Sequence, residues 1–243
     1  MLSIFHKEIK VFFSSLIGYV VIGVFLLMMG LMMFVFPDYS LLNYNYATLD
    51  QLFDIAPMIF MFLIPAVTMR SFAEENQTGT IELLVTKPIK EFEIILGKFF
   101  ANFVLVVIAL LPTLIYYYTV YQLGSPKGNL DSGAVVGSYI GLLFLGASFT
   151  AIGIFASSVS NNQIVAFILA VFCCFFVYWS FDFLSKIPYF VGSIDDLIQK
   201  IGIEEHYRSI SRGVIDSRDV IYFLSLILLF LTFTLTALER RKW

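Results

Sequence analysis

Long apolar runs alternate with short polar connections along most of the chain. A helix needs about 20 consecutive apolar residues to cross roughly 30 Å of hydrocarbon. We predict six such helices, at residues 16–36, 52–69, 99–120, 134–157, 164–181 and 220–238. Pro57 and Pro65 in the second run and Pro112 in the third indicate kinks, where neighbouring groups must satisfy the freed carbonyls. The pattern predicts an all-α integral membrane protein in which residues 1–243 form one transmembrane domain.

The first apolar run is expected to stay in the protein as an anchor helix. It is longer than the apolar core of a signal peptide, which has about 7–15 residues. The residues after it, Pro37-Asp38-Tyr39-Ser40, lack the small-x-small pattern of a cleavage site.

Residues 1–15 predict an amphipathic helix that lies along the membrane instead of crossing it. Apolar side chains recur at helical spacing on one side, and the other side carries Lys7 and Lys10. A short basic helix of this kind lies in the interface with its lysines toward the lipid headgroups. A plain basic flank that only sets orientation explains the same lysines, so both interpretations stay open. The apolar side consists of Leu2, Phe5, Ile9 and Phe12.

Residues 70–98, between the second and third runs, form a dense charged block that cannot enter lipid. We predict a short helix from Thr78 through Val85, ended by Pro88 because the residue before a proline avoids helical geometry. A second helix would start at Ile89 and continue into the third run. Carboxylates near the start of the short helix suit its dipole and would form an acidic knob; a solvated surface loop is the alternative. These carboxylates are Glu74, Glu75 and Glu82.

The last long connection, residues 182–219, is too apolar for a free loop. Isoleucine, leucine and aromatic residues recur through its first half, which predicts short helices lying on the membrane surface. Asp216 can cap the helix of the sixth run, and Asp219 would lie in the first turn of that helix.

The chain gives little sign of catalysis or of a bound cofactor. His206, with Glu204 and Glu205, is the best candidate cluster for a membrane enzyme, but we interpret it as a solvated helix face. Cys173 and Cys174 are adjacent in an apolar run and are interpreted as core residues. The phosphate-binding motif G-x-x-x-x-G-K-[ST] does not occur, so this chain is not expected to bind ATP. We expect no catalytic residue and no metal site.

Composition agrees with a membrane protein, since 59% of the residues are hydrophobic and 14% are charged, against about 25% charged in soluble domains. A net charge of −3 gives no sign of nucleic-acid binding. We expect the six spans to carry no formal charge. That expectation argues against a proton-coupled pump or an ion channel, which place carboxylates or histidines within the membrane.

The distribution of basic residues predicts the orientation. Lys7, Lys10, four basic residues in the stretch 70–98 and the C-terminal Arg-Arg-Lys all fall on one side if six spans cross the membrane. The positive-inside rule makes this side, with both termini, cytoplasmic. Residues 182–219 go to the outer side because they hold seven acidic residues beside five basic ones, and because the number of spans requires it.

Small residues recur four apart in the fourth run, at Gly137 and Gly141 and again at Ala147 and Ala151. Such spacing lets two helices approach closely. Packing within the subunit is the preferred interpretation, and an interface between two subunits is the alternative.

Two stretches resemble the permeases of ABC-2 type transporters. One is Met69-Arg-Ser-Phe-Ala-Glu-Glu-Asn-Gln-Thr-Gly-Thr-Ile-Glu-Leu-Leu-Val-Thr-Lys-Pro-Ile89, followed by Glu93-Ile-Ile-Leu-Gly-Lys98, and the other is Ser211-Arg-Gly-Val-Ile-Asp-Ser-Arg-Asp219. With the amphipathic start and the six-span layout, the likeness extends over essentially the whole chain. Within the family the chain is most similar to the permease subunit of the gliding-motility-associated ABC transporter. It departs from many relatives at Asn76-Gln77, where they carry basic residues.

The resemblance implies the architecture of a type V exporter, in which a separate subunit binds ATP and Mg²⁺. In that family the segment between the second and third spans forms a coupling helix that docks on the ATPase, and the N-terminal helix braces the contact. Short helices between the fifth and sixth spans cap the exit path. Docking would fall on Glu74, Glu75, Thr78, Gly79, Thr80, Glu82 and Leu83. The brace would be Phe5, Glu8, Ile9 and Phe12, and the outer-loop motif Arg212, Gly213, Asp216, Arg218 and Asp219.

The resemblance therefore implies a permease subunit of an ATP-driven exporter in a bacterial cytoplasmic membrane, in the setting of gliding motility. Its partners would be the ATPase subunit, a second copy or a related membrane subunit, and membrane lipids. A scaffold that couples an ABC ATPase to a motility or secretion machine, without moving a solute, is the alternative.

Overall fold

The computed structural model describes residues 1–37, 40–41, 47–80, 90–189, 192 and 194–240, and all regular structure in them is helical. Six stretches of helix are long and apolar enough to cross a membrane, and each overlaps a predicted span. The protein is thus a multi-pass membrane protein with six candidate spans. These are Leu16–Phe34, Asp50–Gln77, Glu91–Leu123, Ser132–Val159, Gln163–Ser185 and Ser217–Glu239.

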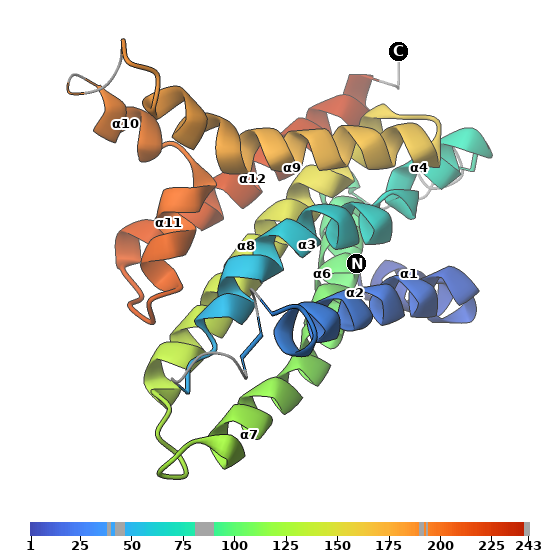
Figure 1. Cartoon of the computed structure of the whole chain (residues 1–243). Coiled ribbons are helices and arrows are strands. Elements are labelled where there is room, and N and C mark those ends of the chain that lie inside the picture. Colours follow the sequence, from blue (N-terminus) through green and yellow to red (C-terminus); the bar gives the residue numbers. More distant parts are fainter. Residues whose placement is uncertain (38–39, 42–46, 81–89, 190–191, 193, 241–243) are drawn as a thin grey trace.

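The N-terminal helix α1 (Leu2–Ser14) and the first span α2 (Leu16–Phe34) meet at a corner at Ser15. The backbone of Ser15 is extended, and its hydroxyl accepts a hydrogen bond of 3.2 Å from the Ile17 N–H. This side chain caps α2 and separates the two helices. α1 packs along α6 (Glu91–Leu110) (Figure 1), so the predicted N-terminal helix is present.

The second span is longer than predicted because the helix does not end at Met69. α3 (Asp50–Thr68) passes into α4 (Arg70–Gln77) through Met69, whose φ of −55° and ψ of −29° are helical. Thr78 caps the C-terminus of α4 instead of starting a new helix, so the predicted start of the short helix is wrong. The rest of that prediction, residues 81–85, lies outside the described residues.

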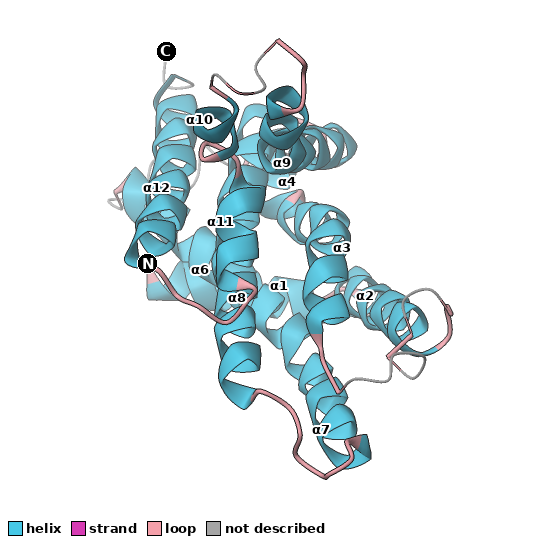
Figure 2. Ribbon diagram, turned by 60° about the vertical axis from the view of Figure 1, so that its left-hand side comes forward, coloured by secondary structure: helices cyan, strands magenta, loops and turns pink. Residues whose placement is uncertain are grey.

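Pro112 lies at an irregularity, as predicted for the third span. In the third span α6 is followed by the 3-10 turn η1 (Leu111–Thr113), which contains Pro112, and then by α7 (Leu114–Leu123). α7 extends beyond the rest of the bundle (Figures 1 and 2). Pro57 and Pro65 are both buried inside α3.

The central helix is α8 (Ser132–Val159), which packs against α3, α6 and α12 (Figure 2). Its small residues face inward. A Cβ atom added at Gly137 would lie 2.8 Å from Gly213 Cα, and one added at Gly141 would lie 2.9 Å from Ile210 Cγ2. These glycines therefore let another segment of the same chain approach, as preferred from the sequence.

The connection between the fifth and sixth spans contains short helices, as predicted. α9 (Gln163–Ser185) is followed by α10 (Asp195–Gln199) and α11 (Ile203–Ile210), and α12 (Ser217–Glu239) is the last span. α11 lies against α8, α9 and α12. The Tyr207 hydroxyl on α11 also donates a hydrogen bond of 2.6 Å to a carbonyl of α3.

Asp216 and Asp219 start α12 as predicted, but His206 is not solvated. The Asp216 carboxylate accepts a hydrogen bond of 2.9 Å from the Arg218 N–H. The His206 side chain is 15% exposed, lies 2.7 Å from an Asp219 oxygen and stacks on the Tyr222 ring. The interpretation of His206 as part of a solvated face is wrong because α11 folds back against α12.

The expectation of charge-free spans is wrong, because charged side chains lie inside the observed span helices. Asp54 lies within the predicted second span, one turn inside α3. Lys98 was placed in the polar connection, but it lies two turns inside α6, which starts at Glu91.

Candidate functional site

α4 lies beside the turn between α8 and α9, at the end of the molecule opposite α7, α10 and α11 (Figure 1). Ion pairs and hydrogen bonds join it to α1, α6 and α8. We call this arrangement the α4 junction. The side of α4 that faces the other helices is buried and consists of Ser71, Phe72, Ala73 and Glu75.

Lys98 is the centre of an ion cluster within the α4 junction. Its side chain is 1% exposed, and its Nζ atom lies 2.8 Å from Glu8 Oε1 on α1 and 3.0 Å from Glu75 Oε2 on α4. The same ammonium donates a hydrogen bond to the Ser71 carbonyl and lies 4.9 Å from the centroid of the Phe72 ring. A buried ammonium needs such partners because the loss of its hydration costs several kcal/mol.

Lys7 brings a second ammonium to the cluster from α1. Its Nζ atom lies 2.8 Å from Glu75 Oε1 and 3.8 Å from Glu8 Oε1. Burial alone lowers the pKa of Lys7, but the hydrogen bond and charge of Glu75, with the charges of Glu8 and Glu74, raise it above its ordinary value. Two ammonium groups and two carboxylates thus neutralise one another where α1, α4 and α6 meet.

Ser157 joins α8 to the point where α3 passes into α4. Its hydroxyl accepts hydrogen bonds of 2.9 Å from the Phe72 N–H and 3.0 Å from the Ala73 N–H, and it donates one of 2.9 Å to the Met69 carbonyl. The first N–H groups of a helix have no partner within that helix. The Ser157 side chain of α8 therefore provides hydrogen-bond partners both for the Met69 carbonyl at the end of α3 and for the first N–H groups of α4.

Side chains near the two ends of α4 reach other helices. Arg70 donates a hydrogen bond of 3.2 Å to Ser15 Oγ at the corner between α1 and α2. Asn76 Nδ2 donates one of 2.8 Å to the Ser160 carbonyl, directly after α8. The departure at Asn76 from the basic residue of many relatives thus lies on the inner side of α4, and it ties α4 to the end of α8.

The other side of α4 and the turn after it are exposed. Thr78 Oγ1 donates a hydrogen bond of 2.8 Å to the Glu74 carbonyl and lies 2.9 Å from the Thr80 hydroxyl. Gly79 has a φ of +70°, a left-handed conformation that glycine adopts without strain. We call this surface the exposed tip of α4, formed by Glu74, Gln77, Thr78, Gly79 and Thr80.

The predicted docking residues do not share one surface. Glu74, Thr78, Gly79 and Thr80 lie on the exposed tip. Glu75 is 8% exposed and is paired with lysines, so its place in an acidic knob is wrong. Adjacent residues on a helix point about 100° apart, which turns one carboxylate outward and the next inward. The remaining two, Glu82 and Leu83, lie outside the described residues.

The predicted brace is half-buried along α1, and Glu8 pairs with Lys98. The most buried residue of α1 is Ile4, which was not predicted. A Cβ atom added at Gly97 of α6 would lie 3.2 Å from Ile4, so the glycine admits α1 at this point. The four predicted residues are Phe5, Glu8, Ile9 and Phe12.

The outer-loop motif is separate from the α4 junction. Gly213 has a φ of +83° and packs directly against Ala134 of α8, so it needs both the conformation and the small size of glycine. Arg212 and Arg218 are exposed. Asp216 and Asp219 have the structural roles described above.

The sequence did not single out Lys98 or Ser157 as functional residues. The charges around Lys98 predict the edge of a polar loop, although a lysine two turns after the acidic start of a helix could also have indicated a buried partner. Ser157 carried no signal, because a serine near a helix end is common. Within the described ranges, no group of three or more His, Cys, Asp or Glu side chains is positioned to hold a metal ion.

A comparison with models of protein families matches residues 2–243 to one described as ABC-2 family transporter protein. The match covers nearly the whole chain, including α1, the α4 junction and the outer-loop motif. A comparison with curated proteins finds no match.

Proposed function

Because the chain belongs to the ABC-2 family of transporter proteins, we propose that it is the permease subunit of an ATP-driven exporter. The observation that carries this proposal is the α4 junction, where one short helix is joined to α1, α6 and α8 and still presents an exposed tip. A partner ATPase that gripped this tip would act on three helices at once.

The proposed mechanism needs no ionisable relay through the membrane. ATP binding would draw two ATPase subunits together and displace the exposed tip of α4. The Lys98 cluster and the Ser157 hydrogen bonds would pass this displacement to α6 and α8 as a rigid-body movement. Movement of α8 against the other helices would then open a path toward the opposite side.

The proposal includes the partners that the family resemblance implies. The ATPase subunit would bind ATP and Mg²⁺, and this chain would bind neither. A second copy of the chain, or a related membrane subunit, would complete the path. The exposed tip and both termini would face the cytoplasm, and the setting in gliding motility rests on the sequence resemblance alone.

The second candidate is a membrane scaffold that reports the state of an ATPase without moving a solute. The same junction would serve it, since a rigid connection transmits a signal as well as work. Reconstituted vesicles separate the two. Export of an accumulated compound that depends on ATP supports the permease, whereas ATP turnover with no movement of any compound supports the scaffold.

The docking proposal is tested by reversing a charge on the exposed tip. Glu74→Lys should abolish co-purification of the ATPase in mild detergent, because Glu74 is exposed and makes no ion pair within the described residues. Glu205→Lys is the matched control, since it reverses an exposed glutamate on α11 at the other end of the molecule. Equal ATPase recovery with both variants would refute docking at the tip.

A further inference from the structure

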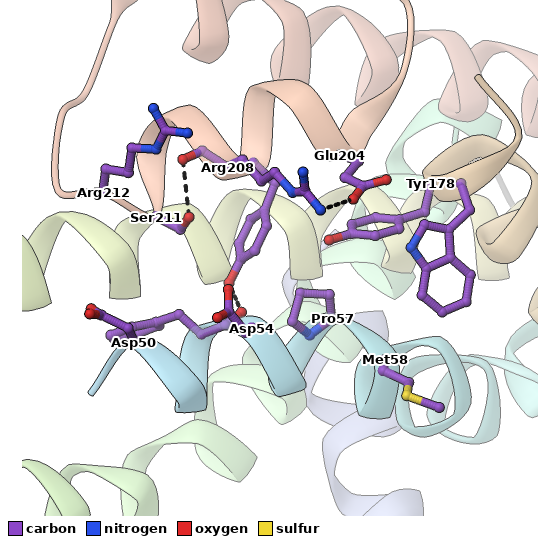
Figure 3. A pocket seen from close by; sticks show the side chains of 12 residues that line it. Asp50, Asp54, Pro57, Met58, Tyr178, Glu204, Arg208, Ser211 and Arg212 are labelled. Atoms are coloured by element: carbon purple, nitrogen blue, oxygen red, sulfur yellow. Dashed lines mark hydrogen bonds and ion pairs between the residues drawn. The ribbon is translucent and has the colours of Figure 1, made fainter. Parts of the chain in front are cut away.

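A cleft of about 800 Å³ opens between the start of α3, the end of α9 and α11 (Figure 3). The cleft lies at the start of the helical stretch Asp50–Gln77, whereas the exposed tip of α4 lies at its end. None of the predicted docking residues or brace residues that the structure describes lines the cleft. Its walls come from three helices that are fixed to one another, in part by the hydrogen bond from Tyr207 to the Phe53 carbonyl.

Charges of opposite sign line the two long walls of the cleft. Asp50 and Asp54, four residues apart on α3, share one wall, and Arg208 and Arg212 form the facing wall (Figure 3). Neither aspartate has an ion pair or a hydrogen bond to its side chain within the described residues, and the same is true of Arg212. Like charges at this helical spacing repel by about 0.2–0.5 kcal/mol, so a bound cation would relieve the aspartate pair.

Glu204 adds a buried carboxylate with an unused oxygen. The residue is 7% exposed, and its Oε1 atom lies 2.6 Å from Arg208 Nη2. Its Oε2 atom is buried and has no hydrogen-bond partner among the described residues. The carboxylate lies in the cleft beside the Tyr178 ring (Figure 3). An unsatisfied buried polar atom costs about 1–3 kcal/mol, which a donor group in the cleft would recover.

The polarity of the cleft changes along α3. Asp50 and Arg212 lie near one end, and Pro57 and Met58 lie at the other (Figure 3). Trp179 also lines the cleft. Because a helix rises 1.5 Å per residue, Met58 is roughly 12 Å further along the span than Asp50. The Met58 side chain is largely exposed, as expected for a surface in contact with lipid. The cleft thus offers ionic groups at the end of the span and apolar groups deeper in it.

We propose that this cleft binds a phospholipid with a zwitterionic headgroup that carries an amine and a phosphate, as in phosphatidylethanolamine. The phosphate would accept hydrogen bonds from Arg208 and Arg212, because guanidinium groups match phosphate oxygens. The amine would donate to the aspartates of α3 and toward Glu204. An acyl chain would follow Met58 and Trp179. The inference adds a ligand to the proposed permease, and binding can be measured whether or not the protein transports.

Trp179 provides a direct readout of occupancy. The chain has two tryptophans, so Trp243→Phe leaves Trp179 as the single indole, which is excited selectively at wavelengths that tyrosine does not absorb. The full chain in detergent micelles is titrated with phosphatidylethanolamine brominated in its acyl chains, since bromine quenches indole fluorescence on contact. We expect saturable quenching. Phosphatidylglycerol with the same brominated chains lacks the amine and should bind about tenfold more weakly, as expected for the loss of one charge-assisted hydrogen bond.

Variants of exposed residues test the two proposed headgroup contacts, that of the amine with the aspartates and that of the phosphate with the arginines. Asp50→Asn combined with Asp54→Asn should reduce the affinity for phosphatidylethanolamine to that for phosphatidylglycerol. Arg212→Gln should weaken both lipids. Asp195→Asn and Arg218→Gln remove the same charges outside the cleft and should change neither.

Three results would overturn the inference. One is equal quenching by the two lipids, and another is quenching that none of the cleft variants alters, since either would indicate general contact with apolar chains. The third is protection of Trp179 by soluble phosphoethanolamine at the same concentration as the lipid. In that case the apolar end of the cleft would contribute nothing, and the ligand would not be a lipid.

Discussion

The Lys98 ammonium lies 3.0 Å from Glu75 Oε2, and the two residues belong to consecutive spans separated by the charged connection. The geometry is that of an ion pair and not of a hydrogen bond, because Glu75 Oε2 accepts no hydrogen bond within the described residues. The pair fixes α4 to α6. Any movement of α4 that kept this pair would carry the start of the third span with it.

Removing the ammonium of Lys98 should strongly destabilise the protein. Lys98→Met leaves the Glu8 and Glu75 carboxylates with the Lys7 ammonium as their one shared partner among the described residues. Breaking a buried pair in this way costs about 3–5 kcal/mol. The free energy of unfolding in detergent measures the loss. Lys10→Met, at an exposed lysine of α1, should have little effect. If Lys98→Met is as stable as Lys10→Met, the cluster does not hold the junction together.

A second substitution should restore part of the stability that Lys98→Met loses. Adding Glu8→Gln to Lys98→Met removes the surplus carboxylate and leaves Lys7 paired with Glu75. The double variant should regain part of the lost stability, because a neutral group costs less to bury than a charge.

Ser157→Ala should loosen the attachment of α4 to α8. The change leaves two buried N–H groups and one carbonyl without the serine hydroxyl, at about 1–3 kcal/mol for each unsatisfied group. Ser158→Ala is the matched control, because among the described residues the Ser158 hydroxyl bonds only to the Phe155 carbonyl of its own helix. Hydrogen exchange at the Phe72 and Ala73 amides should increase in the first variant and not in the second.

Gly137→Ala should disturb the packing of α8 against the outer-loop motif. The new methyl group would lie 2.8 Å from Cα and from the carbonyl oxygen of Gly213, and backbone atoms cannot move aside as a flexible side chain can. Overpacking of this kind costs about 1–3 kcal/mol. Gly23→Ala has open space around it and should be neutral or slightly stabilising in a helix. Unfolding of the purified variants tests the contrast.

Glu204 should make the stability of the outer helices depend on pH. Burial raises its pKa above the ordinary value of 4.5, with smaller contributions from Asp182 and Glu205 in the same direction and from Arg208 and Lys186 in the opposite one. The folded state therefore binds the proton more tightly than the unfolded state does. The resulting stabilisation is complete below pH 4.5 and is lost as the pH rises through the folded pKa.

Glu204→Gln is neutral at every pH and should remove this dependence. Because other carboxylates titrate in the same range, the quantity to measure is the difference in unfolding temperature between the natural protein and the variant, from about pH 4 to about pH 7. A difference that stays constant over this range would contradict the prediction.

The sequence predicted the six spans and the helix cap at Asp216, because these depend on local patterns. A run of apolar residues is visible without knowledge of the fold, and Asp216 could be recognised as a cap from its position before an apolar run. The α4 junction depends instead on contacts between distant segments. Glu74 and Glu75 look alike in the sequence, and they differ only because α3 continues helically into α4 and turns Glu75 toward Lys98.

Two errors share one cause. A charge beside an apolar run predicts the end of a span at Lys98, yet two carboxylates from other helices make its burial possible. Acidic neighbours in the sequence predict a solvated His206, whereas its actual partners, Asp219 and Tyr222, come from α12. Tertiary partners decide whether a charged or polar side chain is buried, and single-chain patterns do not show them.

The near-continuous helix from Asp50 to Gln77 gives the molecule a single beam about 40 Å long. Asp50 and Asp54 of the cleft lie on its first two turns, and the tip proposed to meet the ATPase lies at its far end. A tilt at one end must then appear at the other without passing through any loop. A flexible segment inserted in the middle of this helix would leave the cleft and the tip intact, but a tilt of one would no longer reach the other.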